Sequence, residues 1–279
     1  MGETCVPDDP KRIIALYTPP LAALLSLDSK PIGLTPVTAV ADEFPSYLAD
    51  KVQGIEIVGL DYEPNLEKIT QLKPDLILGW DHHEQAYPIL SKIAPTILTQ
   101  PDGEPSSGDE WKEYFSFVAE AIGKQDIAQQ VLDKYNQRIA QMQAAIGNQY
   151  VGKAISVAQV TEKYGIEVYT KNSFSGSILS ELGLERPKLQ DVIKPRGVIE
   201  AISAEKLELI DGDILFVLNF NKDDRELLND LLKDPLWKTL RAVQNNQIYP
   251  VDGWTWVVAN PLAADAILDD LYKPLSIAP

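Results

Sequence analysis

The stretch KQDIAQQVLDKYNQRIAQMQAAIG, residues 124–147, contains no proline and no interior glycine. A helix of roughly 24 residues is about 36 Å long at 1.5 Å per residue, well above the usual length. We expect it to act as a stiff strut between two halves of the chain. Its apolar residues recur every three or four positions, as on one face of an α-helix: Ile127, Val131, Tyr135, Ile139, Met142 and Ile146.

Before this helix, short apolar runs of strand length alternate with segments of helical spacing. Strands separated by helices predict a parallel sheet that is covered on both faces. The expected strands are 13–17, 32–34, 76–80 and 96–98, and the expected helices are 21–27, 66–72, 87–93 and 111–122.

After the helix, the same alternation resumes, with strands expected at 154–160, 166–169 and 214–218. The 279 residues suffice for two lobes of ordinary size. The predicted fold class is therefore α/β, with two parallel-sheet lobes joined by one long helix. The expected divisions are an N-terminal lobe at 1–123, the connecting helix at 124–147 and a C-terminal lobe at 148–279.

The two halves also share a short repeated pattern. EKI at 67–69 and DLIL at 75–78 recur as EKL at 205–207 and DILF at 213–216, at a constant offset of 138 (205 − 67). Generic α/β patterning would give such agreement, and so would two pseudo-equivalent lobes. In the second case, the residues after each strand lie at the sheet edge where open α/β folds bind ligands, and we expect a ligand cleft between the lobes.

Composition excludes several classes of function. The formal net charge is −16, which argues against nucleic-acid or anionic-membrane partners because phosphates require Lys and Arg. The single cysteine, Cys5, excludes a disulfide within the chain. There is no signal peptide and no apolar run near 20 residues, so we expect a soluble chain whose export signal is not part of this sequence. Nucleotide-binding, hydrolase and metalloprotease motifs are missing, so we expect no catalytic residues and no enzyme.

Several segments, taken in order, resemble the periplasmic iron-siderophore binding proteins of ABC importers, in the subgroup whose two lobes are joined by a long helix. No single segment decides the matter, but the ordered set covers nearly the whole chain. The segments are GETCVPDDPKRII at 2–14, EPNLEKI at 63–69, LKPDLI at 72–77, LSKIAPT at 90–96, ISAEKL at 202–207 and the region 254–262.

The resemblance implies a monomeric protein, periplasmic or lipid-anchored, that captures a ferric siderophore and delivers it to an inner-membrane permease. It implies that Glu67 and Glu205, one per lobe, dock onto the permease; a surface Glu near a helix start would look the same. No cofactor is expected, and the siderophore itself would hold the iron. We favour a hydroxamate or citrate-hydroxamate ligand, because no arginine cluster is evident for a triply charged catecholate. Haem or cobalamin is the alternative ligand, and a chelatase-like tetrapyrrole enzyme is the alternative from another class.

Residues beside the predicted strand ends are the ligand-binding candidates. Aromatic and imidazole groups could stack on a siderophore, and cations could pair with an anionic complex. Core packing or a solvated surface is the competing interpretation for each residue. Adjacent side chains on an extended segment point opposite ways, so we expect only one of His82 and His83 to face the ligand. Because the chain has only two histidines, we expect no direct zinc or manganese site. The candidates are Tyr17, Tyr62, Trp80, His82, His83, Lys171, Asn172, Arg196, Phe220, Trp254 and Trp256.

Overall fold

A computed structural model describes residues 4–36, 44–99, 108–162, 165–202, 204–272 and 274–275. The chain forms two compact units. The first takes the described residues within Met1–Gly103, Glu110–Lys134 and Asn260–Leu262, and the second takes those within Glu104–Asp109, Tyr135–Ala259 and Ala263–Pro279. Each unit is built around its own five-stranded sheet.

The sheet of the first unit is entirely parallel, as the sequence predicts. Its order is β3-β2-β1-β6-β7, so β1 occupies the centre. The strands are β1 (Ile13–Leu16), β2 (Gly33–Thr35), β3 (Glu56–Ile57), β6 (Leu76–Trp80) and β7 (Thr96–Thr99). A separate antiparallel hairpin is formed by β4 (Gly59–Leu60) and β5 (Glu63–Pro64), which the sequence did not predict.

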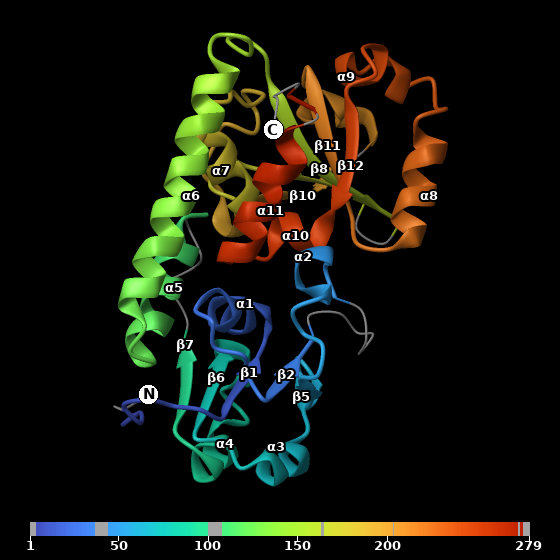
Figure 1. The fold of residues 1–279 in the computed structure, drawn as a ribbon. Coiled ribbons are helices and arrows are strands. Elements are labelled where there is room, and N and C mark those ends of the chain that lie inside the picture. Colours follow the sequence, from blue (N-terminus) through green and yellow to red (C-terminus); the bar gives the residue numbers. More distant parts are fainter. Residues whose placement is uncertain are drawn as a thin grey trace. The chain divides into compact units, whose positions relative to one another are not determined.

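Helices cover both faces of this sheet because side chains alternate along each strand. Ile13 and Ala15 join one apolar cluster with α1 (Thr18–Ser26), α2 (Ser46–Ala49) and α5 (Glu110–Ala121). Ile14 and Leu16 join the opposite cluster with α3 (Leu66–Leu72) and α4 (Tyr87–Ile93). Figure 1 shows α3 and α4 side by side.

The sheet of the second unit is mixed, whereas we expected parallel strands. Its order is β10-β9-β8-β11-β12, and β9 runs antiparallel to both β8 and β10. Only residues 162–164 separate β8 from β9, which is far too short for a parallel crossover. The strands are β8 (Ile155–Thr161), β9 (Gly165–Tyr169), β10 (Val198–Ile202), β11 (Ile214–Asn219) and β12 (Ile248–Asp252).

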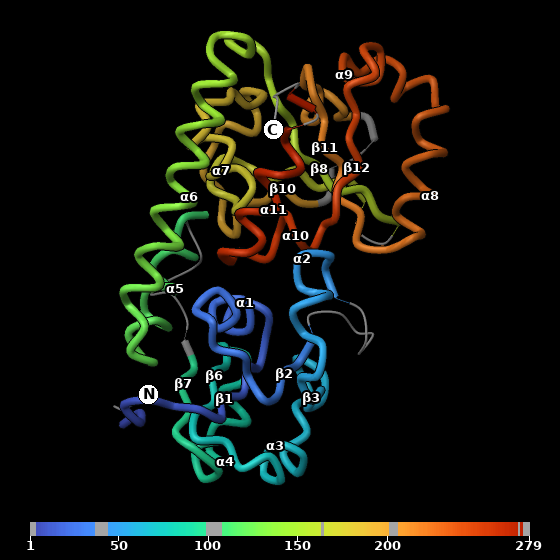
Figure 2. Tube along the Cα trace, viewed as in Figure 1, coloured from blue at the N-terminus to red at the C-terminus, as the bar shows by residue number. Residues whose placement is uncertain are grey.

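Helices also flank the second sheet on both sides, as Figure 2 shows. One face packs against α8 (Lys222–Leu231) and α9 (Arg241–Gln244) through a cluster that includes Leu215, Val217 and Leu228. The other elements are α7 (Phe174–Glu181), α10 (Gly253–Val257), α11 (Pro261–Tyr272) and the 3₁₀ turns η2 (Pro195–Gly197), η3 (Ala204–Leu209) and η4 (Trp237–Thr239).

The long helix α6 spans Gln125–Ile146, which confirms the predicted helix to within one residue at each end. It belongs to the first unit up to Lys134 and to the second from Tyr135. In the second unit, Tyr135 donates a hydrogen bond to Glu181 (3.0 Å), and Arg138 pairs with Asp265 and Asp269 of α11 (both 2.5 Å). Neither α6 nor any other helix in the described part of the chain is long and apolar enough to span a membrane.

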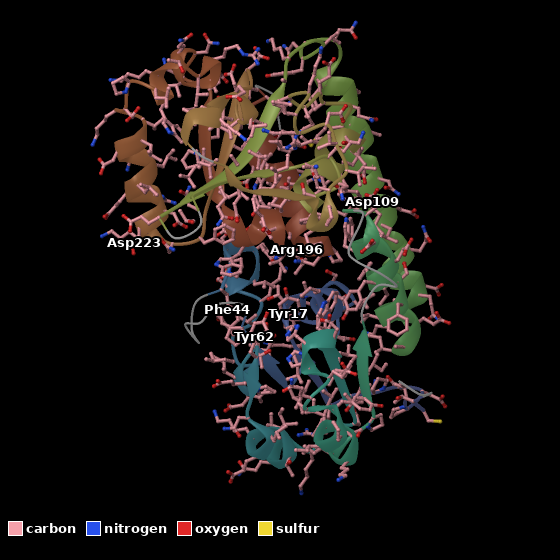
Figure 3. All side chains as sticks on the ribbon, turned by 180° about the vertical axis from the view of Figure 1, so that it is seen from behind. Tyr17, Phe44, Tyr62, Asp109, Arg196 and Asp223 are labelled. Carbon is pink, nitrogen blue, oxygen red and sulfur yellow. The ribbon has the colours of Figure 1, made fainter. Side chains whose placement is uncertain are left out.

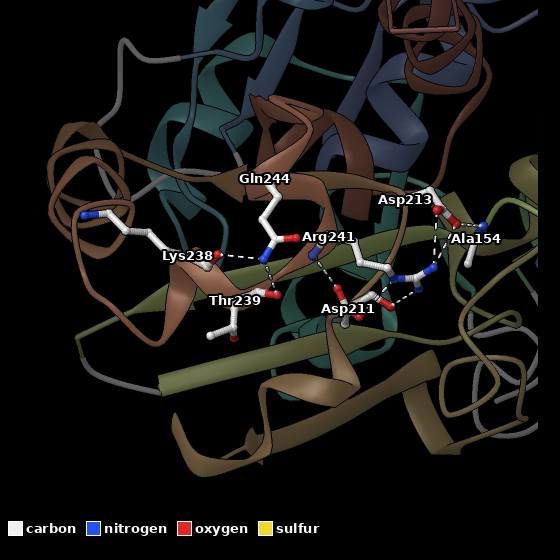
Figure 4. Close-up of polar contacts among 7 residues, drawn as sticks. All are labelled: Ala154, Asp211, Asp213, Lys238, Thr239, Arg241 and Gln244. Atoms are coloured by element: carbon white, nitrogen blue, oxygen red, sulfur yellow. Dashed lines mark hydrogen bonds and ion pairs between the residues drawn. The ribbon is translucent and has the colours of Figure 1, made fainter.

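The repeated pattern has the same local role in both units. The Asp75 carboxylate accepts hydrogen bonds from the backbone N–H groups of Lys11 (2.8 Å) and Arg12 (2.9 Å), at the start of β1. At the same offset of 138 (213 − 75), Asp213 accepts one from Ala154 N–H (2.8 Å), at the start of β8. In the second unit, Arg241 also binds Asp211 and Asp213 (Figure 4). Each aspartate thus fastens a central strand to the strand that follows it in the sheet order.

Candidate ligand-binding site

Four predicted site residues meet in the first unit. The Tyr17 ring lies 5.6 Å from the Trp80 ring and 5.2 Å, edge-on, from the His82 ring. The Tyr62 ring lies 4.7 Å from His82 at an interplanar angle of 33°, in a tilted stack. Tyr17 and Tyr62 lie on the same part of this unit in Figure 3. We call Tyr17, Tyr62, Trp80 and His82 the aromatic cluster.

Strand pairing explains why these residues meet. β1 and β6 are parallel neighbours, with Ile13 opposite Leu76, so the residues that follow both strands reach the same sheet edge. Tyr17, directly after β1, has a backbone φ of +115°, which residues other than glycine rarely adopt. Such a strained residue persists only where its surroundings hold it, and strained residues concentrate at functional sites.

Asp61 is a member of this site that the sequence did not reveal. Its side chain is buried, and Oδ1 lies 2.9 Å from His82 Nε2. Its carbonyl oxygen lies 2.8 Å from His83 Nε2. The residue lies between β4 and β5, and only this unpredicted hairpin brings it back to the end of β6. Its position directly before the candidate Tyr62 was the one available sequence signal.

The ligand-facing role predicted for His83 does not fit the structure, because this side chain is buried with both ring nitrogens engaged. Nδ1 accepts the Trp80 backbone N–H (3.1 Å), so Nε2 must carry the proton that is donated to the Asp61 carbonyl. Burial lowers the pKa of His83, which keeps the ring neutral. His83 therefore anchors the Asp61 turn instead of contacting a ligand.

The same geometry bears on metal binding. One possible ligand atom from each of Asp61, His82 and His83 lies within 4.8 Å of the others, a spacing that suits a metal ion. However, a metal at His83 Nε2 would require the proton to move to Nδ1, where it would oppose the Trp80 N–H. The three residues therefore do not offer three free ligand atoms, and we assign no metal to them.

The aromatic cluster is graded from buried to exposed. Trp80 packs partly against the core, and its ring lies 4.9 Å from the Tyr114 ring. The Tyr17 phenol is also partly buried, and this burial raises its pKa. Burial alone lowers the pKa of His82, but the hydrogen bond and charge of Asp61, helped by Asp81, raise it above its ordinary value. Tyr62 is 79% exposed, so it offers the largest accessible aromatic surface of the four.

In the second unit, Phe220 and Trp254 form a pair at the carboxyl ends of β11 and β12. Their rings are 5.0 Å apart and nearly perpendicular, and both side chains are half-buried. Gly253 permits this approach, because a Cβ there would lie 2.7 Å from the Phe220 ring. Phe220 stands 138 residues after His82 (220 − 82). The corresponding edges of the two sheets therefore both carry ring side chains.

Trp256 is not a ligand-facing residue, contrary to the prediction. The spacing of two residues would place Trp254 and Trp256 on one face of an extended segment, but these residues form α10. In a helix, residues two apart point in nearly opposite directions. Trp256 is accordingly 0% exposed, stacks near Phe216 (4.6 Å) and donates Nε1–H to Asp270 (2.8 Å).

Lys171 lies in the loop after β9, and Arg196 lies in η2. Asn172, next to Lys171, holds these two segments together by hydrogen bonds to Lys194. The Asn172 amide donates to the Lys194 carbonyl (2.9 Å) and accepts from the Lys194 N–H (3.1 Å). Both cations already have acidic partners: Lys171 pairs with Asp191 (3.3 Å) and Arg196 with Glu200 (3.2 Å). Arg196 has a φ of +58°, so it too carries backbone strain.

Of the two acidic residues expected to dock, Glu67 has a described side chain and Glu205 a described backbone only. Glu67 is exposed and is the second residue of α3, after the Asn65 N-cap, whose side chain accepts Lys68 N–H (3.0 Å). The Glu205 backbone lies in η3, and its side chain is outside the described residues. Because β6 and β11 occupy the fourth place in their sheets, the elements before them correspond.

Comparison with known proteins identifies the family. Residues 13–253 match the family described as "Periplasmic binding protein". The chain belongs to this family. It is 32% identical over 276 residues to the probable siderophore-binding lipoprotein YfiY of Bacillus subtilis (strain 168), covering 95% of this chain and 82% of YfiY.

Two further members of the periplasmic binding protein family extend the comparison. The chain is 32% identical over 282 residues to the Fe(3+)-citrate-binding protein YfmC of Bacillus subtilis (strain 168), covering 98% of this chain and 84% of YfmC. The crystal structure of Staphylococcus aureus SirA complexed with staphyloferrin B superposes with a TM-score of 0.81 at 29% identity. That match covers 100% of this chain and 97% of the SirA chain. YfiY and YfmC are both named as binding proteins, and SirA holds staphyloferrin B in its structure.

Proposed function

We propose that this protein is the substrate-binding component of an ABC importer, that it works outside the cytoplasm, and that it captures a ferric siderophore. The observation that carries the proposal is the family match over residues 13–253, together with relatives named for siderophore and Fe(3+)-citrate binding. The aromatic cluster and the Phe220–Trp254 pair supply rings at sheet edges, which suit a bulky, partly apolar ligand. Binding and release would require no catalytic residue.

Within this function we favour a weakly charged complex, such as a hydroxamate or citrate-hydroxamate chelate of Fe(III). The first unit places the carboxylates of Asp61 and Asp81 around His82. In the second unit, the charges of Lys171 and Arg196 are already balanced by acidic neighbours. A polyanionic complex would need cations beyond these.

Haem is a weaker fit to the aromatic cluster. An axial histidine needs a free ring nitrogen for the iron, and the same residue usually donates its other N–H to an acceptor. Both nitrogens of His83 are engaged, and His82 lies beside two carboxylates. We therefore retain haem as a comparison ligand in the experiment and not as a second proposal.

We propose that delivery uses Glu67 and Glu205 as paired contacts to a permease. The equivalent places of β6 and β11 support this assignment, because two equivalent acidic contacts suit a partner with two-fold symmetry. The exposure of Glu67 also fits a contact residue.

Titration of intrinsic fluorescence tests the proposed function. The chain has five tryptophans, of which Trp80 and Trp254 are half-buried beside the proposed ligand surfaces. We expect saturable one-to-one quenching by ferrichrome at micromolar concentration or below, and no quenching by the iron-free chelator. Ferric citrate, a ferric catecholate, haemin and cobalamin complete the panel.

Two variants make this titration specific to the site. Tyr62→Ala removes the most exposed ring of the aromatic cluster and is expected to weaken affinity about tenfold, which corresponds to about 1.4 kcal/mol. Ile89→Ala, which truncates a half-exposed apolar side chain of α4, is the matched control and should bind like the wild type. Saturation by haemin or cobalamin alone would overturn the ligand class, and no saturable response to the panel would overturn the proposed function.

A further inference from the structure

The turn at Asp61–Tyr62 is held to the end of β6 by two histidines in different ways. His83 donates Nε2–H to the Asp61 backbone carbonyl (2.8 Å). His82 Nε2 lies 2.9 Å from the Asp61 carboxylate. The first contact is a hydrogen bond of a neutral ring and stays the same across the physiological pH range. The second becomes an ion pair when His82 gains a proton.

Asp61 also determines where Tyr62 lies. Its carboxylate holds the His82 ring, and its backbone leads directly into Tyr62, whose ring stacks on that same His82 ring at 4.7 Å. Asp61 is 7% exposed, whereas Tyr62 is 79% exposed. A buried carboxylate therefore supports an exposed aromatic surface from beneath.

The groups around His82 favour its protonated form. Asp61 faces Nε2 at 2.9 Å, and Asp81 faces Nδ1 at 3.6 Å. The His83 ring lies 4.2 Å away and is neutral, and the rings of Tyr17 and Tyr62 lie 5.2 Å and 4.7 Å away. An imidazolium at this position therefore lies among two carboxylates and three aromatic rings.

We propose that Asp61 is a positioning residue that fixes the Tyr62–His82 stack as a platform for the ligand, and that one proton on His82 tightens this platform. The proposal rests on the proposed function and adds to it a link between ligand affinity and pH. Asp61 acts through His82 and Tyr62 and does not itself contact the ligand.

The direction of the link follows from the His82–Asp61 pair. Because these contacts raise the pKa of His82 above 6.5, the ion pair contributes fully below 6.5 and is lost as the pH rises through the folded-state pKa. Above that pH, a neutral hydrogen bond holds the turn less firmly. Affinity for a ligand of constant charge should therefore decrease as the pH rises through this range.

Proton NMR of the ligand-free protein tests the first half of the proposal. The chain has only two histidines, so two imidazole Cε1–H signals are expected, one titrating above 6.5 and one below. The variant His82→Gln assigns them. Asp61→Asn keeps a hydrogen-bond acceptor but removes the charge, so it should shift the His82 midpoint down, and Asp61→Glu should restore part of that shift.

Asp230→Asn is the matched control, because it removes an exposed carboxylate that pairs only locally with Lys233 (2.7 Å). It should leave both histidine midpoints unchanged. A His82 midpoint that stays in place in Asp61→Asn, or that moves equally in Asp230→Asn, would overturn the proposal whatever the protein binds.

Binding of ferrichrome, a neutral ferric trihydroxamate, tests the second half between about pH 5.5 and pH 8.5. We expect wild-type affinity to decrease by about three- to tenfold over this range, since one linked proton gives at most about tenfold per pH unit. The profile should be flat in His82→Gln and flattened in Asp61→Asn. A flat wild-type profile overturns the proton link and leaves the proposed function intact. Absence of ferrichrome binding at every pH overturns the preference for hydroxamates, and the same profile is then measured with the panel ligand that saturates the protein.

Discussion

At the scale of single residues, two site candidates carry backbone strain. Tyr17 and Arg196 have φ values of +115° and +58°, where a side chain costs roughly 1–2 kcal/mol. Both are candidates in the sequence because they lie beside predicted strands and loops, whereas the backbone strain is visible only in the structure. That both are strained suits a site whose side chains matter more than local stability.

Arg196→Gly should separate stability from function. Glycine adopts positive φ freely, which relieves the strain, but it also has more conformational entropy in the unfolded chain. The net free energy of unfolding should therefore rise by about 0.5–1 kcal/mol. If Arg196 contacts the ligand as the sequence predicts, loss of the guanidinium should weaken binding of ferric citrate, an anionic member of the ligand panel, more than binding of neutral ferrichrome. Urea unfolding and the fluorescence titration measure the two effects.

Lys73→Gly is the control for this change, because Lys73 is also a cation at positive φ (+47°) but ends α3. It should gain similar stability and retain wild-type affinity. If both variants lose affinity equally, the effect would belong to net charge and not to Arg196.

The aromatic cluster shows how far residue-level prediction reached. Tyr17, Trp80 and His82 could be placed together because parallel neighbouring strands end at one edge. Asp61 could not be placed, because its contact with His82 depends on a two-residue-strand hairpin with no sequence signal of its own. Trp256 was misplaced because a five-residue helix was taken for an extended segment.

At the scale of elements, the aspartates before β6 and β11 connect strands that are distant in sequence. Asp75 joins the start of β1 through two backbone N–H groups, and Asp213 joins the start of β8 through one. The repeated pattern is visible in the sequence, but the hydrogen bonds that its aspartates accept from the neighbouring strand are visible only in the structure. The strand order shows that each aspartate secures a neighbouring strand at the sheet centre.

Asp75→Ala is expected to lower the free energy of unfolding by about 2–3 kcal/mol, because two backbone N–H groups lose a charged acceptor. Asp9→Ala is the control, since Asp9 forms only an exposed ion pair with Lys11 (2.6 Å) that is worth about 0–1 kcal/mol. Thermal and urea unfolding compare the two. Equal losses in both variants would show that the hydrogen bonds to the Asp75 carboxylate add no stability beyond that of a surface charge.

Elements were predictable where they are long or strongly patterned. The α6 boundaries, α3 and β6 follow from periodicity and proline or glycine limits. The direction of β9 did not follow, because strand alternation with helices was extended across a connection too short for it. The short connection between β8 and β9, and not the residue pattern of either strand, indicates that the two strands are antiparallel.

At the scale of the whole molecule, the proposed permease contact requires both units at once. Glu67→Lys combined with Glu205→Lys is expected to abolish uptake of radioactive iron in cells while leaving the affinity for the ferric complex unchanged. The reason is that charge reversal at a docking contact repels the partner without touching the aromatic surfaces.

Glu120→Lys with Glu226→Lys reverses the same number of exposed charges, one in α5 and one in α8. This control should transport normally despite the equal change from a net charge of −16. Reduced ligand affinity in the Glu67 and Glu205 variant, or equal loss of uptake in the control, would refute the docking assignment.

The return of Asn260–Leu262 to the first unit has a consequence for synthesis on the ribosome. The Asn260 amide, 1% exposed, donates to the Tyr47 hydroxyl (3.0 Å), yet residue 260 is translated 126 positions (260 − 134) after Lys134. At 5–20 residues per second, the early-made unit waits about 6–25 s for its last segment. During that interval the nascent chain is an unfinished structure open to chaperones, so the unit that is translated first is not complete until residues 260–262 have emerged.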